Sequence, residues 1–221
     1  MKKTVKTILY SALCSLCIFV SLDGYSQEQQ TSTESSLTPK LGIKGGVSFT
    51  NLFIEDVDNE SMKVGGHVGL FAKIPMTEGV SFMPELLYFN KGTKATYNNS
   101  IQGKGEYRFN LNYIESPATF AFNIVENFSL HAGAYVAYLA SANVKNLQDG
   151  TIQNAETLDA DDFNRWDYGL VGGAAFDIDH FTIGARYNYG LAEVGKSGSL
   201  AGDLTKDAKN SAFSIFLGFA F

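Results

Sequence analysis

The residues most suggestive of chemistry are 190–197, because GLAEVGKS matches the phosphate-binding pattern GxxxxGK followed by Ser or Thr. A working phosphate loop follows a buried strand and opens a helix whose first backbone amides hold the phosphates. Here the preceding residues alternate between polar and apolar types, and residues 198–203 are poor helix formers. We therefore interpret the match as a coincidence within a loop and predict no nucleotide cofactor.

Other residue types that could do chemistry lack partners at a useful spacing. The three histidines, His67, His131 and His180, fall on separate segments without metal-ligand spacing. The sequence shows no nucleophile elbow and no carboxylate pair of the kind that hydrolyses glycosides. Both cysteines, Cys14 and Cys17, lie within the first 26 residues. We therefore predict a protein that is not an enzyme, with no catalytic residue, cofactor or metal site.

The first 26 residues have the features of a secretory signal peptide. A basic start precedes an apolar run over residues 8–22, which is too short to span a bilayer as a helix. Small residues at positions 24 and 26 predict cleavage near Ser26/Gln27, and the alternative is an uncleaved anchor. Cleavage makes the formal net charge of −6 two units more negative. An acidic chain without a basic patch argues against nucleic acid as a partner.

Eight segments of the remaining chain alternate between apolar and polar residues, as strands with two different faces do. The segments cover residues 40–49, 63–74, 81–91, 107–122, 128–141, 165–177, 181–189 and 213–221. The fourth segment changes phase, which predicts a β-bulge between Tyr113 and Pro117, because one extra residue exchanges the two faces. The segment lengths suit tilted membrane strands, which need about 9 to 11 residues.

The connections between these segments alternate in length. Three are tight turns, at residues 75–79, 123–127 and 179–180, and four are long and polar, at residues 53–62, 92–106, 142–164 and 192–210. Short turns at one rim and long loops at the other are typical of outer-membrane barrels. We therefore predict an all-β fold, an eight-stranded antiparallel up-and-down transmembrane β-barrel over residues 40–221. Both termini would face the periplasm, and residues 27–39 would form a disordered periplasmic lead-in.

The distribution of glycine indicates which face of the strands points inward. A soluble barrel of the lipocalin type, the alternative, would turn its apolar face inward. Glycine weakens a strand and has no advantage on a solvated surface, whereas in a narrow barrel it makes room for long side chains. Most strand glycines share the polar face: Gly42, Gly46, Gly65, Gly69, Gly133, Gly169, Gly173, Gly184, Gly190 and Gly218. The polar face is therefore predicted to be the interior.

The predicted interior contains a network of charged and imidazole side chains. Its members are Lys44, His67, Lys73, Glu85, His131, Asp167, Asp177 and Arg186. Buried charges are tolerated when they are paired, so Glu85 is expected to neutralise Arg186 or Lys44, with Asp167 or Asp177 serving the others. Two roles remain open for this network, structural filling of the lumen and a path for protons or ions.

Four stretches of the sequence resemble the PorT-like outer-membrane β-barrel proteins, a family of outer membrane protein beta-barrel domains. They are residues 42–52 (GIKGGVSFTNL), 84–88 (PELLY), 111–117 (LNYIESP) and 184–191 (GARYNYGL). The resemblance covers essentially the whole chain after the leader and implies a membrane-embedded barrel. Because the founding member of that family is tied to protein secretion, the resemblance also implies an accessory role in a secretion system as one alternative.

The end of the chain is similar to the C-terminal signal that the outer-membrane barrel assembly machinery reads. Apolar residues occupy every second position from Phe213 to Phe221, and Phe219 and Phe221 are the assembly residues that this similarity implies. The machinery is therefore one expected partner. The others are outer-membrane lipid, lipopolysaccharide and an extracellular protein that contacts the long loops.

Taken together, these features predict a non-enzymatic barrel in the outer membrane of a Gram-negative bacterium. Its role would be that of a structural or interaction module with long extracellular loops. A small-solute, porin-like channel is the alternative from a different functional class.

Overall fold

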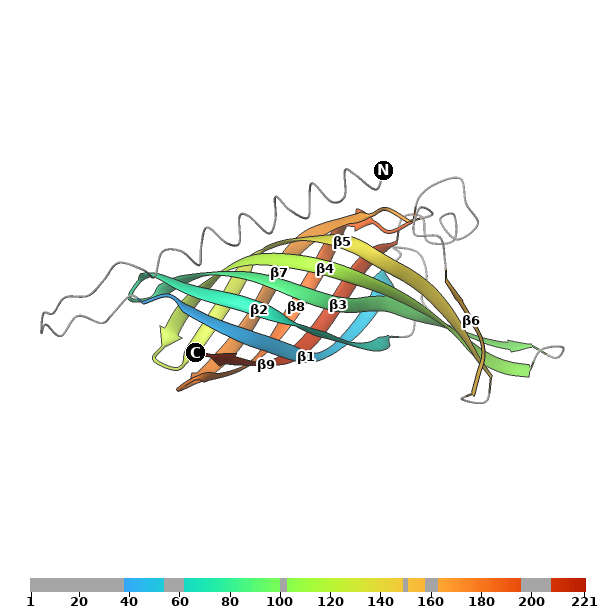
Figure 1. Cartoon of the computed structure of the whole chain (residues 1–221), viewed down its shortest axis with the longest axis horizontal. Helices are drawn as coiled ribbons and strands as arrows, with labels where there is room; N and C mark the ends of the chain where they lie inside the picture. The colour runs from blue at the N-terminus through green and yellow to red at the C-terminus, as the bar shows by residue number, and fades with distance from the viewer. Residues whose placement is uncertain (1–37, 54–61, 100–102, 149–150, 158–162, 196–207) are drawn as a thin grey trace, which may run out of the picture. The chain divides into compact units, whose positions relative to one another are not determined.

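The computed structural model of the chain describes residues 38–53, 62–99, 103–148, 151–157, 163–195 and 208–221 (Figure 1). The strands formed by these residues are β1 Lys40–Phe53, β2 Lys63–Thr77, β3 Val80–Asn99, β4 Gly103–Val125, β5 Phe128–Gln148, β6 Thr151–Thr157, β7 Trp166–Ile178, β8 Phe181–Glu193 and β9 Lys209–Ala220. No helix in the described residues is long and apolar enough to cross a membrane. The expected signal peptide, its cleavage site and most of the expected lead-in lie outside the described residues.

Eight of the strands close into an antiparallel barrel. Strands that follow one another along the chain pair from β1 to β5, and the wall continues through β7, β8 and β9. The barrel closes where β9 pairs with β1, from Gly42↔Ala220 to Phe53↔Lys209. β6 pairs with β5 at the end of the sheet order and is an addition to the wall. The predicted all-β, eight-stranded antiparallel barrel is therefore confirmed, and β6 was not predicted.

The tight turns lie where the sequence predicts them. Two-residue gaps separate β2 from β3, β4 from β5 and β7 from β8. In the last of these turns, Asp179 adopts a positive φ of 53°, a left-handed conformation that aspartate tolerates better than most residues. Following the rule for outer-membrane barrels, we call the rim with these turns the periplasmic rim and the opposite one the outer rim.

Alternation along the strands gives the barrel an apolar outer face and a polar inner face. In β7, Leu170 and Phe176 are each 54% exposed, whereas Asp167 is 2% exposed. β9 repeats the pattern, with Leu217 at 61% and Ser214 at 1%. Apolar side chains outward and polar side chains inward are the arrangement of a barrel in lipid and the reverse of a soluble barrel. The prediction that the polar face is the interior is confirmed.

Aromatic side chains mark both borders of the apolar outer face. Near the periplasmic rim, the rings of Phe128 and Phe176 lie 4.8 Å apart, and near the outer rim Tyr138 contacts Trp166 edge-on at 5.3 Å. Phe128 and Tyr138 are separated by about 33 Å along β5. A strand tilt of about 40° reduces that length to an apolar band about 25 Å tall, the height found in outer-membrane barrels.

The β-bulge predicted in the fourth segment is wrong. β4 pairs with β3 without any shift of register, and its buried positions keep one phase through Leu111, Tyr113 and Glu115. The apparent change of phase arises because Leu111 and Tyr113 point into the lumen, where they join an apolar cluster. The irregularity lies in β5 instead, where Ala140 has no opposite residue in the pairing with β4.

Two of the four expected long loops are mostly strand. Within residues 92–106, β3 runs on to Asn99, and within residues 142–164, β5 continues to Gln148 and β6 follows. The four strands β3 to β6 therefore continue side by side beyond the rim of the barrel (Figure 1). We call this region the outer sheet, and it comprises residues 93–99, 103–110, 143–148 and 151–157. The expected loops 53–62 and 192–210 lie largely outside the described residues.

Candidate functional site

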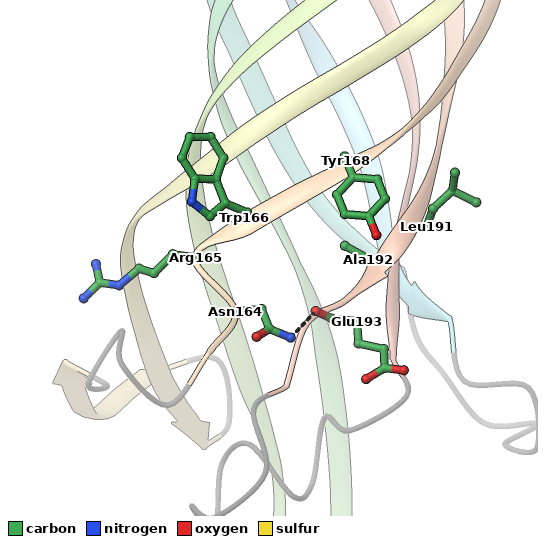
Figure 2. A pocket seen from close by; sticks show the side chains of 7 residues that line it. All are labelled: Asn164, Arg165, Trp166, Tyr168, Leu191, Ala192 and Glu193. Carbon is green, nitrogen blue, oxygen red and sulfur yellow. Dashed lines mark hydrogen bonds between the residues drawn. The ribbon is translucent and has the colours of Figure 1, made fainter. Parts of the chain in front are cut away.

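Near the outer rim, β7 and β8 separate and leave a pocket in the wall. Their pairing ends at Gly169↔Gly190, and beyond it Phe163 bridges Gly195. The gap is a pocket of about 340 Å³ (Figure 2). It is lined by Asn164, Arg165, Trp166, Tyr168, Leu191, Ala192 and Glu193. The side-chain amide of Asn164 donates a hydrogen bond to the Glu193 carbonyl at 2.8 Å, which connects the segment before β7 to β8 (Figure 2).

This pocket opens on the outer face of the barrel at the level of the aromatic border. Trp166 and Tyr168 are 59% and 53% exposed. Because Trp and Tyr favour the boundary between acyl chains and headgroups, the pocket lies at headgroup level. Its lining contains no serine, cysteine or histidine and therefore offers no nucleophile activated by a base.

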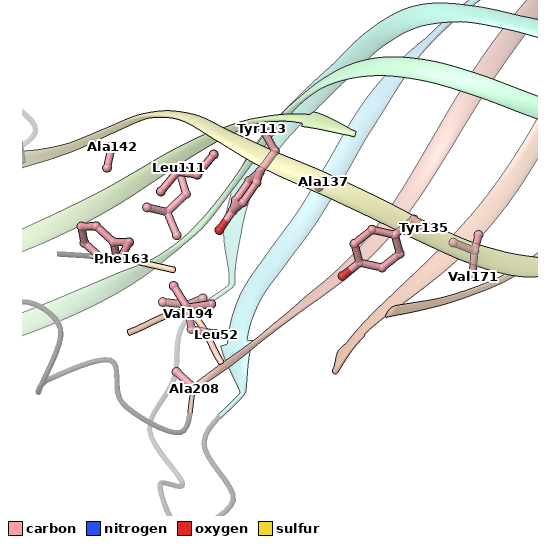
Figure 3. Packing of buried hydrophobic residues seen from close by; sticks show 11 residues of the cluster. Leu52, Leu111, Tyr113, Tyr135, Ala137, Ala142, Phe163, Val171, Val194 and Ala208 are labelled. Carbon is pink, nitrogen blue, oxygen red and sulfur yellow. The ribbon is translucent and has the colours of Figure 1, made fainter. Parts of the chain in front are cut away.

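An apolar cluster closes the outer end of the lumen. It gathers Leu52 from β1, Leu111 from β4, Phe163 from the segment before β7 and Val194 from the segment after β8 (Figure 3). None of these four side chains is more than 3% exposed. We call these four residues the apolar plug. The same cluster continues along the inner wall through Tyr113, Tyr135, Ala137, Leu139, Ala142, Val171 and Ala208.

Directly beneath the plug lies a buried ionic cluster around Lys91. The Lys91 ammonium lies 2.7 Å from a Glu115 oxygen and 3.0 Å from Asp167 Oδ2. The Tyr135 hydroxyl and the Asn210 amide donate to the same aspartate oxygen at 3.2 and 3.0 Å. Lys91 also lies 4.3 Å from the centre of the Tyr135 ring. These contacts place the Lys91 ammonium between two carboxylates and give Asp167 two further hydrogen-bond donors, which offsets part of the cost of desolvation.

A second ionic cluster lies deeper in the lumen around Glu85. Arg186 donates through Nη1 and Nη2 to both carboxylate oxygens of Glu85, at 2.8 and 2.7 Å, a bidentate geometry. Lys44 donates to Glu85 Oε1 at 3.0 Å, and its ammonium lies 3.7 Å from the centre of the Phe216 ring. Glu85 therefore pairs with both of the cations that the sequence offered as alternatives.

The two clusters balance each other in formal charge. The cluster around Lys91 has one cation and two carboxylates, whereas the cluster around Glu85 has two cations and one carboxylate. Asn188 lies two residues from Arg186 on β8 and donates to Glu115 at 2.7 Å, which links the two clusters. Mutual compensation of this kind is what a narrow, desolvated lumen requires.

Toward the periplasmic rim, the interior becomes partly accessible. Lys73 pairs with Asp177 at 2.7 Å, and the two side chains are 24% and 27% exposed. Thr182 donates to the other oxygen of Asp177 at 2.6 Å. This pair lies where the lumen meets the periplasm, so it is only partly desolvated.

Ser129 and His131 form a hydrogen-bonded pair that the sequence analysis missed. Ser129 Oγ and His131 Nε2 are 3.0 Å apart, and their spacing by two residues on β5 places them on one face. Both are buried in the lumen, and among the described residues His131 Nδ1 has no hydrogen-bond partner. A catalytic serine needs an accessible position and an oriented histidine, so this pair does not form a nucleophilic site. His67 is likewise packed, with its ring stacked on Phe89 at 5.0 Å.

The structure places the residues of the predicted network on the inner face of the barrel. Buried members are Lys44, His67, Glu85, His131, Asp167 and Arg186, and the partly exposed members are Lys73 and Asp177. The network predicted from the sequence did not include Lys91 and Glu115, which form the most deeply buried ion pair. Glu115 lies within residues 113–117, where the bulge was predicted, and the alternation in the sequence assigned it to neither face. Lys91 lies an even number of residues from Glu85 on β3, so alternation places both side chains on the inner face. This alternation could have identified Lys91 from the sequence.

The phosphate-loop match lies at the outer end of β8. Residues 190–193 are strand, and Gly195 bridges Phe163. A strand does not present the successive amides that hold phosphates at the start of a helix. Lys196 and Ser197 lie outside the described residues. In the part of the chain that the structure describes, no group of three or more His, Cys, Asp or Glu residues could hold a metal ion.

The C-terminal residues lie on the seam that closes the barrel. Phe219 packs on the outer face against Phe181, with the ring centres 5.1 Å apart, and against Phe221 at 5.9 Å. The Phe221 amide donates to the Leu41 carbonyl at 2.9 Å, which extends the pairing of β9 with β1 to the end of the chain.

A closed, eight-stranded antiparallel barrel with an apolar exterior and a polar, filled interior defines the class of outer-membrane β-barrel proteins. The chain belongs to the family described as outer membrane protein beta-barrel domain, whose family model matches residues 25–194. Membership of this family indicates the outer membrane of a Gram-negative bacterium as its location. No curated protein sequence matches the chain significantly.

Several solved barrels are similar in structure. Ail, the attachment invasion locus protein of Yersinia pestis, solved with the heparin analogue sucrose octasulfate, is 14% identical over 83% of this chain and 99% of its own, with a TM-score of 0.48. Neisserial surface protein A is 13% identical over 82% and 97%, with a TM-score of 0.46. OprG from Pseudomonas aeruginosa is 13% identical over 82% and 95%, with a TM-score of 0.40. These values are too low to transfer a function.

Proposed function

We propose that the protein is a non-enzymatic outer-membrane barrel with a closed lumen, and that it acts as an interaction module through its outer sheet. The observation that carries this proposal is the burial of the central charges. The side chains of Glu85, Glu115 and Lys91 are 0%, 0% and 1% exposed. An ion path needs polar groups that water can reach, and the apolar plug covers these charges on the outer side.

The outer sheet supports a role in protein contacts. Among the described residues, its strand from β3 pairs with β4 alone, and β6 pairs with β5 alone, so both edges of the sheet are open. Open edges present unpaired backbone donors and acceptors that can pair with a strand of another protein. The outer sheet therefore takes the place of the long loops predicted from the sequence as the proposed surface for an extracellular partner.

Within the family, we assign the chain to the PorT-like type. The four stretches that carry this resemblance contribute Lys44, Glu85, Glu115 and Arg186, which belong to the two ionic clusters. The resemblance therefore concerns residues that stabilise the lumen, and it gives no separate support for an accessory role in secretion. The position of Phe219 and Phe221 on the closing seam supports recognition of β9 by the barrel assembly machinery.

A conductance measurement tests the closed lumen. We expect no discrete openings when the purified protein is inserted into planar bilayers, because both ionic clusters fill the cross-section beneath the plug. A variant with a thinner plug, Leu111→Ala with Phe163→Ala, should also remain silent, since the ionic clusters beneath are unchanged. Discrete openings of the wild-type protein would contradict the proposal and favour the small-solute channel.

A further inference from the structure

The two edge strands of the outer sheet run in opposite directions. The outer part of β3, residues 93–99, leads away from the barrel, whereas β6, residues 151–157, leads back toward it. Among the residues that the structure describes, neither edge pairs with a further strand. The opposite directions follow from an even number of strands, because β3, β4, β5 and β6 are each antiparallel to the next.

This arrangement makes the two edges of one copy complementary to the edges of another. Outer-membrane barrels have their tight turns at the periplasmic rim, so all copies in one membrane have the same orientation. When β6 of one copy lies beside the outer part of β3 of the next, the two strands are antiparallel, as they are in the rest of the sheet. Two β6 strands, or two β3 strands, cannot become antiparallel in this way, because a rotation about the membrane normal leaves the outward direction of a strand unchanged.

The register of the barrel determines which residues meet when two copies lie at the same level. A row of opposed residues that starts at Leu41 on β1 passes once around the barrel and returns to β1 at Asn51, ten residues nearer the outer rim. Crossing the four strands of the outer sheet, half of that circuit, therefore shifts the level by about five residues. Within one copy, Ala155 lies in the row of Lys94. Because opposed side chains share a face, the shift must be even, and a shift of about four residues places Ala155 opposite Asn98 of the next copy.

The residue types at this contact suit the pairing of strands. β6 is regular on the barrel side of its bulge at Gln153, so residues 154–157 would pair with residues 96–99 of the next copy. In these two segments, Glu156 is the one charged residue, and neither segment contains proline or glycine. The pairing therefore opposes no like charges, and every residue has a backbone donor. Edge strands that avoid pairing often contain lysine or proline.

The distance between two copies paired in this way matches the width of the barrel. Four strands about 4.8 Å apart, with a tilt of about 40°, span about 25 Å in the membrane plane. Eight such strands enclose a backbone cylinder about 16 Å across, and outward side chains add about 5 Å on each side. The outer diameter is therefore about 26 Å, so neighbouring walls would be in contact.

We propose that the outer sheet binds a second copy of this chain, with β6 of one copy paired antiparallel to the outer part of β3 of the next. Main-chain hydrogen bonds between the two edges hold the contact. The contact is heterologous, so each copy keeps one free edge at either end of a row, and the copies form rows of barrels instead of closed twofold dimers. The inference rests on the proposed function, because it names the protein that the outer sheet contacts.

Disulfide formation between two populations that each carry a single cysteine tests this inference. The background is the full chain with Cys14→Ser and Cys17→Ser, which removes both native cysteines. One population carries Ala155→Cys, the other carries Asn98→Cys, and both are refolded into the same vesicles. Directly opposed residues have Cα atoms about 4.5 to 5.5 Å apart, within reach of a disulfide. Under mild oxidation, the mixture should therefore give severalfold more cross-linked dimer than either population alone.

The matched control replaces Ala155→Cys with Lys145→Cys. Lys145 stands directly opposite Ala155 on β5 and is one strand further from the neighbouring copy. Its Cα would lie about 10 Å from that of Asn98, beyond the reach of a disulfide, so the control mixture should cross-link poorly. Dilution of the protein in lipid should lower the yield of the Ala155→Cys mixture, because the contact joins separate copies. Each variant is first shown to fold by the shift of its unheated band on a denaturing gel.

Three results would overturn the inference. The first is an equal yield from the Ala155→Cys mixture and the Lys145→Cys control, as random collision would give. The second is stronger cross-linking within the Ala155→Cys or the Asn98→Cys population than between them. The third, in intact outer membranes treated with a thiol-to-amine cross-linker, is attachment of these positions to a different protein without any cross-linked dimer. That third result would leave the proposed interaction module standing, and failure of the closed lumen is read separately from the conductance.

Discussion

Glu85 accepts hydrogen bonds from two buried cations, so the neutralisation of both depends on one carboxylate. Arg186 and Lys44 are 3% and 4% exposed, so neither can be solvated if Glu85 is lost. A buried ion pair contributes little net stability compared with apolar residues, but removing one partner leaves an uncompensated charge. The residues of this network are therefore constraints on folding and register.

Glu85→Gln tests this constraint. The glutamine keeps the shape but not the charge, and it leaves Lys44 and Arg186 buried beside a neutral group. We expect a loss of about 3 to 5 kcal/mol in the free energy of unfolding. Urea titration of the refolded protein, followed by the fluorescence of Trp166, measures it. The matched control Glu78→Gln lies in an exposed turn and should change stability by about 1 kcal/mol or less.

Equal stabilities of Glu85→Gln and Glu78→Gln would show that the lumen is hydrated enough to solvate two unpaired cations. That result would contradict the desolvated interior.

Gly184→Ala tests why glycine gathers on the inner face. A methyl group at Gly184 would overlap the Phe216 ring, and that ring is held in place by the Lys44 ammonium. Overpacking should cost about 1 to 3 kcal/mol in unfolding free energy. On the neighbouring strand, Gly172 faces outward and has no atom within 4 Å of an added methyl group. Gly172→Ala is therefore the control and should be neutral or slightly stabilising in the same urea titration. Equal costs at both positions would contradict the assignment of faces.

At the scale of the strands, period-two alternation predicted the wall of the barrel but not the outer sheet. Alternation is a sign of two different environments, lipid and lumen, and it weakens where a strand leaves both. Residues 92–106 and 142–164 contain many Asn, Gly and charged residues, which are depleted in ordinary strands. Leu111 and Tyr113 led to the wrong prediction of a bulge for a related reason, since they are apolar residues inside the lumen and imitate a change of phase.

A designed disulfide tests the register of the outer sheet. Asn98 stands opposite Lys104, and directly opposed residues of antiparallel strands have Cα atoms about 4.5 to 5.5 Å apart, close enough for a disulfide. In a chain refolded from residue 27 onward, which has no cysteine of its own, Asn98→Cys with Lys104→Cys should cross-link readily under mild oxidation. Asn98→Cys with Arg108→Cys is the control and should cross-link poorly, because four residues add about 13 Å. Similar yields for both pairs, measured by gel shift, would indicate a flexible loop.

At the scale of the whole molecule, the barrel is closed by layers of different chemistry. The apolar plug, the cluster around Lys91 and the cluster around Glu85 follow one another from the outer rim inward. The sequence could predict that charges face inward and that Glu85 needs a cation, because both follow from alternation and desolvation. It could not predict the partners of Lys91, since Glu115 and Asp167 come from strands whose alignment depends on the register across the barrel.

The central claim is that the apolar face of the strands meets lipid while the charged face is enclosed. Nitroxide labels at Ile215, Leu70 and Leu170, outward positions that are each about half exposed, test it directly when attached before refolding into vesicles. We predict collisions with oxygen, which concentrates in acyl chains, to exceed collisions with a water-soluble nickel chelate at all three positions. Dominant collisions with the nickel chelate would mean that these side chains face water and would contradict the account.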